Sequence, residues 1–332
     1  MAADDSWKRY TVDKVDTVTR GSADALFICC ASFERRAVGA VGRLASGYRC
    51  RRAVVFLYDS PDYREDRLDV LRELRESLER VSLEGVEVIG CDKENVFDGL
   101  GQFATVLHDV VRSTADGGVT LDISTFTKLY LLEVLWTLVE RFRCLNIQAL
   151  CTLPKAYGRG RISEGVTEFA VVPHLGGFLP IDGNVVLFSF LAFEGERNLA
   201  VAEAYDPRLT VALISEPEYR KGYRRRAEEG NSFLLSRPGV VREGIPPHDL
   251  GAILQRLESL NATHVEDEKA GRPSLVLVPL GTHTQALATF LFWKKHRMTH
   301  VVYAFPRAYG KGFRARRSGA TLRFDLQPYL RE

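Results

Sequence analysis

The sequence predicts an α/β protein built from two tandem Rossmann-like domains with mostly parallel sheets, related by a pseudo-two-fold axis. Short apolar runs alternate with amphipathic stretches of helical length, which is typical of parallel strands joined by crossover helices. Several short phrases of the first half recur in the second half in the same order. The length of 332 residues also suits about two domains that each bury a core of their own.

The repeated phrases have closely similar wording. Pro-Lys-Ala-Tyr-Gly at 154–158 recurs as Pro-Arg-Ala-Tyr-Gly at 306–310, each time at the end of an apolar run. A Phe-Glu pair followed by arginine occurs at 33–36 and again at 193–197. The separation of roughly 150–160 residues equals a domain and not the unit of a solenoid. The chain is therefore interpreted as two copies of one fold.

Each half is expected to follow the order βαβαβαβαβ. Strands are predicted at 25–30, 53–58, 86–91, 119–123 and 145–151, and in the second half at 185–191, 209–214, 240–242, 274–280 and 300–305. Helices are predicted at 34–45, 64–80, 96–113 and 127–142, and in the second half at 195–204, 218–229, 247–260 and 283–297. In such a sheet, ligands bind at the carboxyl ends of the strands.

Three segments follow from this pattern. Residues 1–24 are polar and form an arm or an edge strand. Residues 25–180 form the first domain, which ends in a hairpin that includes a strand at 166–173. Residues 181–332 form the second domain, and 319–326 is expected to be its matching last strand.

Composition indicates a globular protein of the cytoplasm. Hydrophobic residues make up 45% and charged residues 27%, and the formal net charge is +2. No apolar run approaches the ~20 residues of a membrane span, and the N-terminus lacks the apolar stretch of a signal peptide. The six cysteines lie in the first half without Cys-x-x-Cys spacing, which favours structural thiols. The seven histidines form no His-Glu-x-x-His motif, so neither a metal nor a cofactor is expected.

The most specific phrase is Asp-Ile-Ser-Thr-Phe-Thr-Lys at 122–128, before a leucine-rich helix. The predicted strand ends at Asp122, Ser124 and Thr125 form the turn, and Thr127 and Lys128 lie on the first turn of the helix. Helix-start amides, hydroxyl groups and one ammonium together can bind a phosphate. The alternative is an ordinary N-cap, in which the hydroxyl of Ser124 or Thr125 satisfies the helix amides and Lys128 is solvated.

This phrase resembles the ligand loop of CARF domains, which usually reads Asp/Asn-x-Thr-Gly-Gly-Thr-Lys, and the tandem arrangement is similar to that of SAVED domains. The resemblance implies a sensor in prokaryotic antiviral defence that binds a cyclic oligonucleotide in a cleft between its two halves. It also implies a separate effector protein as partner, with a monomer or a homodimer as the assembly. Thr125 and Phe126 replace the two glycines of the family phrase, and the second copy, Gly281-Thr282-His283-Thr284, lacks its aspartate and lysine.

Two further groups of residues are candidates for ligand contacts. After the first strand of each copy lie Ser32, Glu34, Arg35, Arg36, Glu194 and Arg197, where arginine can bind phosphate and glutamate a ribose hydroxyl. The alternative is that Glu34 and Arg36 form a salt bridge within the helix that they begin. The repeated turns contribute Tyr157, Arg307 and Tyr309. An aromatic ring beside cations can stack a base, although such a tyrosine can equally pack on the core.

The second copy supplies Gly281, Thr282 and His283 as the counterpart of the Asp122 phrase. His283 is the one histidine in a repeated loop, and it could act as a general acid or base toward a ribose hydroxyl. An alternative function is therefore a metal-independent phosphodiesterase that cleaves cyclic oligonucleotides, or another nucleotide-processing enzyme of this fold. No Gly-x-Gly-x-x-Gly follows the first strand, which argues against a dehydrogenase.

Overall fold

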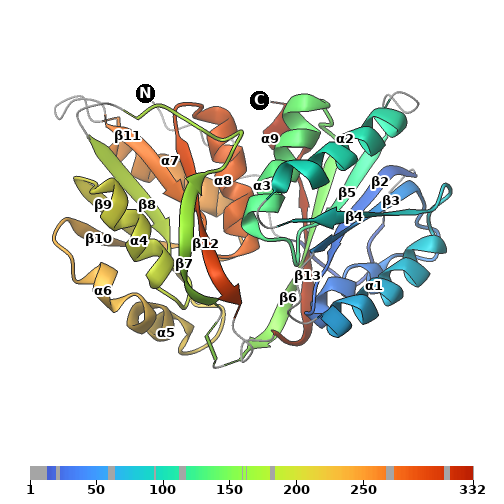
Figure 1. Ribbon diagram of the computed structural model, residues 1–332, viewed down its shortest axis with the longest axis horizontal. Helices are drawn as coiled ribbons and strands as arrows, with labels where there is room; N and C mark the ends of the chain where they lie inside the picture. Colours follow the sequence, from blue (N-terminus) through green and yellow to red (C-terminus); the bar gives the residue numbers. More distant parts are fainter. Residues whose placement is uncertain are drawn as a thin grey trace. The chain divides into compact units, whose positions relative to one another are not determined.

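In the computed structural model, the chain forms two compact units, each built around one mostly parallel sheet (Figure 1). The first unit comprises residues 12–159 and 313–332, and the second unit comprises 160–312. The structure describes residues 13–19, 23–58, 64–92, 95–111, 117–158, 160–161, 163–179, 184–266, 273–309 and 315–331. The fold is therefore α/β with two separate sheets, as the sequence predicts.

The first sheet has seven strands in the order β1-β13-β6-β5-β2-β3-β4. Its strands are β1 (Asp13–Val15), β2 (Asp24–Ala31), β3 (Cys50–Tyr58), β4 (Val86–Cys91), β5 (Gly118–Asp122), β6 (Ile147–Tyr157) and β13 (Ala315–Asp325). The five strands from β6 to β4 are parallel, and β13 and β1 complete the sheet in antiparallel pairs. All eight residues of β2 are buried, as expected for a central strand covered on both faces.

Helices cover both faces of the first sheet. These are α1 (Arg64–Glu79), α2 (Val96–Val111), α3 (Lys128–Trp136) and the short α9 (Gln327–Leu330), with a π-helical turn at Thr137–Arg141. On one face, Phe27 and Val55 share a core with Val70 and Leu74 of α1. On the other face, the ring of Phe56 contacts aromatic rings from α2, α3 and the loop before α3. The alternation of side chains along each strand supplies both cores.

The predicted helix at 34–45 is instead two 3-10 turns, Arg35–Val38 and Val41–Arg43. Gly39 separates them. A Cβ atom at Gly39 would lie 2.5 Å from Cγ2 of the buried Thr152, so glycine lets this segment approach β6 closely. Close packing against the sheet and a second helix-weakening glycine in the interval, Gly42, explain why no continuous helix forms.

The second sheet has six strands in the order β10-β9-β8-β11-β12-β7. They are β7 (Ser163–Val171), β8 (Val185–Phe190), β9 (Leu209–Ser215), β10 (Val240–Ile245), β11 (Ser274–Val278) and β12 (His300–Tyr309). The strands from β10 to β12 are parallel, and β7 pairs with β12 in the antiparallel sense. The central strand β8 is buried throughout.

The helices of the second unit are α4 (Glu196–Tyr205), α5 (Tyr223–Gly230), α6 (Ser232–Leu235), α7 (Leu250–His264) and α8 (His283–Lys295). The first three pack against β7, β8, β9, β10 and β12, whereas α7 and α8 pack against each other (Figure 1). Helix α5 starts later than the predicted residue 218. Gly222 directly before it has φ of 89°, in the left-handed region, which a right-handed helix cannot include.

The two sheets share one strand order, which confirms the internal repeat. When the second sheet is read from β7 to β10, its order β7-β12-β11-β8-β9-β10 matches β13-β6-β5-β2-β3-β4 of the first sheet. In the first unit β2 lies between β3 and β5, and in the second unit β8 lies between β9 and β11 in the same way. Equivalent loops therefore follow equivalent strands in the two units.

The antiparallel strands are exchanged between the two copies. The strand predicted at 166–173 is β7, which pairs with β12 and not with β6, so the expected hairpin of the first domain does not form. The strand predicted at 319–326 is β13, which pairs with β6 of the first unit. β6 and β12 end in the same phrase, so the local sequence of each strand is compatible with pairing to either β7 or β13. At the far edge, β1 pairs with β13 and is an edge strand.

Candidate functional site

The turn after β5 is fixed by a buried network around Asp122. This carboxylate accepts hydrogen bonds from the backbone N–H of Ser124, at 3.0 Å, and from its hydroxyl. Ser124 Oγ in turn accepts the backbone N–H of Thr152 in β6, at 2.7 Å. Asp122 is 2% exposed and Ser124 is fully buried. The polar groups of both residues are therefore engaged in fixing the turn.

Two threonines attach the same loop to neighbouring strands. The hydroxyl of Thr125 donates to the backbone carbonyl of Cys30, at 2.7 Å, near the end of β2. The backbone N–H of Thr127 donates to the phenol oxygen of Tyr58, at 2.7 Å, and that phenol donates to Thr127 Oγ1 at 3.2 Å. Tyr58 is the last residue of β3. The loop 122–128 thus has hydrogen bonds to β2, β3 and β6.

Helix α3 begins directly after this loop. Thr127 is the N-cap, since its Oγ1 accepts the backbone N–H of Tyr130 at 3.4 Å, and Lys128 is the first helical residue. Lys128 is half-buried, whereas the residues from Leu129 to Leu135 are buried. The helix thus has an ordinary N-cap, but the capping hydroxyl is that of Thr127 and not that of Ser124 or Thr125. An N-cap does not preclude anion binding, because the start of a helix carries a partial positive charge in either case.

The buried position of Asp122 perturbs its acidity. Burial raises the pKa of Asp122 to about 6, although the hydrogen bonds from Ser124 and the charge of Arg36 lower it. The ionised carboxylate is therefore disfavoured in this environment. Its role is to position the turn through Ser124.

In the loop after β2, Glu34 and Arg36 pair with each other. Both side chains are buried, and Arg36 Nε donates to the Glu34 carboxylate. Burial lowers the pKa of Arg36, but the charge and hydrogen bond of Glu34, together with Tyr157 and Cys151, raise this pKa overall. The salt-bridge alternative is thus the observed one. Arg36 also lies 3.5 Å from the carbonyl oxygen of Thr152, which links this loop to the Asp122 network.

The other two candidates in this loop differ in exposure. Ser32 is buried, and its Oγ accepts the backbone N–H of Glu34 at 3.4 Å. Arg35 is exposed and forms an ion pair with Glu73 of α1, at 2.6 Å. Of the two arginines, Arg35 is therefore the one that solvent reaches.

In the second unit, Glu194 and Arg197 contact the two strands at the sheet edge. Glu194 accepts the backbone N–H and the hydroxyl of Ser163 in β7, at 2.7 and 2.6 Å. The buried Arg197 donates to the carbonyl of Ala304 in β12, at 3.1 Å, and lies over the ring of Tyr303. These contacts hold β7 to the loop after β8 and β12 to the first turn of α4. They are structural contacts at positions where ligand contacts were predicted.

The counterpart loop at 281–283 forms a complete helix cap. Thr282 is the N-cap of α8 and forms a capping box with Gln285, in which each side chain bonds the other's backbone N–H. A Cβ at Gly281 would lie 2.0 Å from Gln285 Oε1, so glycine is required for this close approach. His283 is the first residue of α8 and is half-buried.

The repeated tyrosine turns end β6 and β12. Tyr157 is half-buried, and its phenol is close enough to Arg36 to raise the pKa of that arginine. The exposed Arg307 lies on β12 beside Gly165 of β7, the neighbouring strand. The backbone of Tyr309 pairs with Ser163, and its side chain lies outside the described residues. The structure therefore brings Tyr157 close to the first-unit network.

Sequence reasoning missed the partners that hold the first-unit loops. Tyr58 and Thr152 join the loops after β2 and β5, and no repeated motif pointed to this role. It also missed His248, which follows β10. Burial lowers the pKa of His248 to about 4, and its buried Nδ1 has no hydrogen-bond partner within the described part of the chain. Its ring packs edge-on against Tyr219, with centroids 5.2 Å apart.

The six cysteines are free thiols in the structure. Five are buried and Cys144 is partly buried, and burial raises the pKa of Cys50 to about 12 and that of Cys144 to about 11. Within the described ranges, no three side chains of His, Cys, Asp and Glu gather as a metal site would require. None of the helices described has both the length and the apolar character needed to cross a membrane.

No protein family and no curated protein matches this chain. Among solved structures, Can2 from Sulfobacillus thermosulfidooxidans in complex with cyclic tetra-adenylate matches with a TM-score of 0.28 and 13% identity. That match covers 40% of this chain and 37% of the Can2 chain. The cytoplasmic domain of a prokaryotic cation chloride cotransporter matches with a TM-score of 0.25 and 12% identity, over 86% of this chain and 96% of that chain. Both are distant similarities between folds.

Proposed function

We propose that this chain is a sensor that binds a nucleotide, of the cyclic oligonucleotide class, through the loop 122–128 of the first unit. The observation that carries the proposal is the attachment of this loop to β2, β3 and β6: Thr125 and Thr127 donate to Cys30 and Tyr58, and Ser124 accepts from Thr152. A loop held in this way keeps one shape before a ligand arrives, and such preorganisation lowers the entropic cost of binding.

The chemistry at the end of this loop suits a phosphate group. The first turn of α3 combines helix-start amides with the ammonium of Lys128. An anion at that position gains from the helix dipole and from one charge-assisted hydrogen bond. Asp122 does not compete with the phosphate, because it is buried and occupied by Ser124.

The location within the sheet supports the same function. Loops after β2 and β5 follow the two adjacent central strands of the first sheet, and Thr152 of β6 contacts both loops. In open parallel sheets, ligands bind outside the carboxyl ends of such strands. Arg35 is exposed on the first of these loops and is the expected second phosphate contact. A role in prokaryotic antiviral defence and a separate effector partner belong to the same proposal.

A thermal-shift screen of the full chain with cyclic and linear oligoadenylates tests the proposal. A ligand that binds only the folded state raises the melting temperature in a concentration-dependent way. At a free ligand concentration of about a hundred times Kd, the folded state is stabilised by about 2.7 kcal/mol. Cyclic oligoadenylates are expected to raise it, and the bound ligand is then recovered and analysed by mass spectrometry. Recovery of intact rings identifies a sensor, whereas linear products identify a phosphodiesterase. No shift with any oligoadenylate would contradict the proposal.

A further inference from the structure

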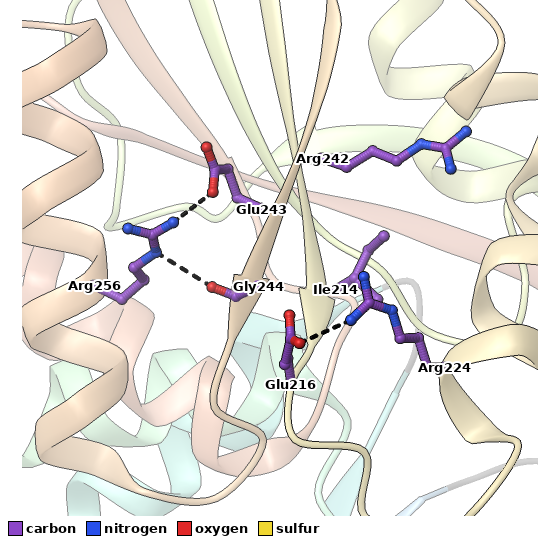
Figure 2. A pocket seen from close by; sticks show the side chains of 7 residues that line it. All are labelled: Ile214, Glu216, Arg224, Arg242, Glu243, Gly244 and Arg256. Carbon is purple, nitrogen blue, oxygen red and sulfur yellow. Dashed lines mark hydrogen bonds and ion pairs between the residues drawn. The ribbon is translucent and has the colours of Figure 1, made fainter.

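A pocket of about 520 Å³ opens at the carboxyl halves of β9 and β10 in the second unit (Figure 2). Its volume lies within the roughly 300–1,000 Å³ that is typical of small-molecule sites. Three guanidinium groups enter it from three different elements, α5, β10 and α7. The lining residues are Ile214, Glu216, Arg224, Arg242, Glu243, Gly244 and Arg256.

Two of the arginines are held in place by carboxylates of the same pocket. Arg224 forms an ion pair with Glu216, at 2.9 Å, and Arg256 forms one with Glu243. Arg256 Nε also donates to the carbonyl of Gly244, at 3.2 Å. Each guanidinium thus has a fixed position at the pocket wall, on either side of strand β10 (Figure 2).

Arg242 differs from the other two. Its side chain is exposed, and within the described ranges its guanidinium has neither an ion-pair partner nor a hydrogen-bond acceptor. Figure 2 shows it extended away from Glu243, the next residue of the strand. Among the lining residues the guanidinium groups outnumber the carboxylates by three to two, and Arg242 is the guanidinium that pairs with neither carboxylate. A guanidinium presents a fork of N–H donors that matches a phosphate.

Glu216 supplies the second half of the recognition chemistry. A Cβ at Gly244 would come within 2.4 Å of Glu216 Oε2, so glycine at this position lets the carboxylate lie directly against β10. Its ion pair with Arg224 uses Oε1, and a carboxylate has acceptor capacity for further donors. Carboxylates repel a bare phosphate but accept hydrogen bonds from hydroxyl groups. The mixed lining therefore favours a ligand that carries both a phosphate and hydroxyl groups.

We propose that this pocket binds a sugar phosphate, with the phosphate on Arg242 and a sugar hydroxyl on Glu216. The site lies in the second unit and uses none of the residues of the loop 122–128, so it goes beyond the function proposed above. A nucleotide and a free sugar phosphate share this chemistry, so one ligand of each kind is included in the test.

Calorimetric titration of the full chain with ribose 5-phosphate, adenosine 5′-monophosphate and inorganic phosphate tests the proposal. We expect saturable binding of ribose 5-phosphate or of the nucleotide that is tighter than binding of inorganic phosphate. The tighter of the two esters identifies the source of the sugar phosphate. Arg242→Gln is expected to weaken binding about ten- to hundred-fold, because one charge-assisted contact is lost. Glu216→Gln is expected to weaken binding of the two esters and not that of inorganic phosphate.

The matched control is Arg225→Gln, which removes the same charge from α5 at an exposed position paired with Glu229. This variant is expected to bind like the wild type, with circular dichroism confirming that all variants are folded. Absence of saturable binding for every probe, or an Arg242→Gln variant that binds like the Arg225→Gln control, would overturn the proposal. Binding that Lys128→Ala abolishes and Arg242→Gln leaves intact would also overturn it, and would assign the ligand to the first unit.

Discussion

The hydroxyl oxygen of Ser124 accepts a hydrogen bond from the backbone N–H of Thr152 at 2.7 Å, while the same hydroxyl donates to Asp122. One buried side chain therefore joins the turn after β5 to the neighbouring strand β6. Thr152 also lies beside Arg36, so the loops after β2 and β5 share a single anchor. The shape of the candidate phosphate loop depends on this contact.

Ser124→Ala removes both hydrogen bonds and leaves the Thr152 N–H without its acceptor. The free energy of unfolding should fall by about 1–3 kcal/mol, the usual cost of unsatisfied buried polar groups. Urea unfolding measures the change. Ser46→Ala is the matched control at an exposed position and should change stability by less than about 0.5 kcal/mol. Equal stabilities of the two variants would show that the contact does not hold the loop.

Asp122→Asn tests the buried carboxyl group. Its pKa of about 6 is raised above the ordinary value near 4, so the folded state binds the proton more tightly than the unfolded state does. The resulting stabilisation is full below about pH 4 and is lost as the pH rises through about 6. Asparagine does not ionise, so the variant should gain up to about 3 kcal/mol relative to the wild type between pH 4 and pH 7. A stability difference that stays constant over this range would rule out the raised pKa.

His248→Phe tests a buried group whose contribution to stability depends on pH in the opposite sense. Burial lowers the pKa of His248 to about 4, from an ordinary value near 6.5, so its neutral form is the one that the fold accommodates. Its contribution to stability is present above about pH 6.5 and is lost as the pH falls toward 4. The wild type should therefore lose up to about 3 kcal/mol relative to the phenylalanine variant between pH 7 and pH 4. Parallel stability curves of the two proteins would contradict this assignment.

The exchange of β7 and β13 predicts a specific cross-link. Thr152 and Thr321 are direct partners across β6 and β13, and their hydroxyl oxygens are 2.9 Å apart. Facing residues of an antiparallel pair have Cα atoms roughly 4.5–5.5 Å apart, which a disulfide can span. The double variant Thr152→Cys/Thr321→Cys should form that disulfide on oxidation, and peptide mapping should separate it from the native thiols. The two single variants are the controls. Failure of residues 152 and 321 to link would contradict the exchange.

Much of the fold could be predicted because each central strand is short, apolar and buried on both faces, as β2 and β8 are. The partners of β7 and β13 could not be predicted, because β6 and β12 end in the same phrase and local pattern does not choose between them. The prediction of a helix at 34–45 was wrong because Gly39 packs against Thr152, a residue distant in sequence.

For the candidate site, sequence predicted the loop 122–128 and its capped helix correctly as elements. It could not show that Glu34, Arg36, Glu194 and Arg197 contact protein groups, since each of these contacts depends on a partner distant in sequence or on burial. Tyr58 and Thr152 carry no motif, and their roles arise only when β3 and β6 lie beside β2 and β5.

The most direct measurement of the central claim is the affinity of wild-type protein and Lys128→Ala for a cyclic oligoadenylate, by calorimetry. Lys14→Ala, at an exposed position of β1, is the matched control for loss of one lysine. Loss of the Lys128 ammonium should cost ~1.5–3 kcal/mol, a roughly ten- to hundred-fold weaker Kd, with an unchanged melting temperature of the ligand-free protein. An affinity equal to that of Lys14→Ala, with both variants folded, would contradict binding of phosphate at the start of α3.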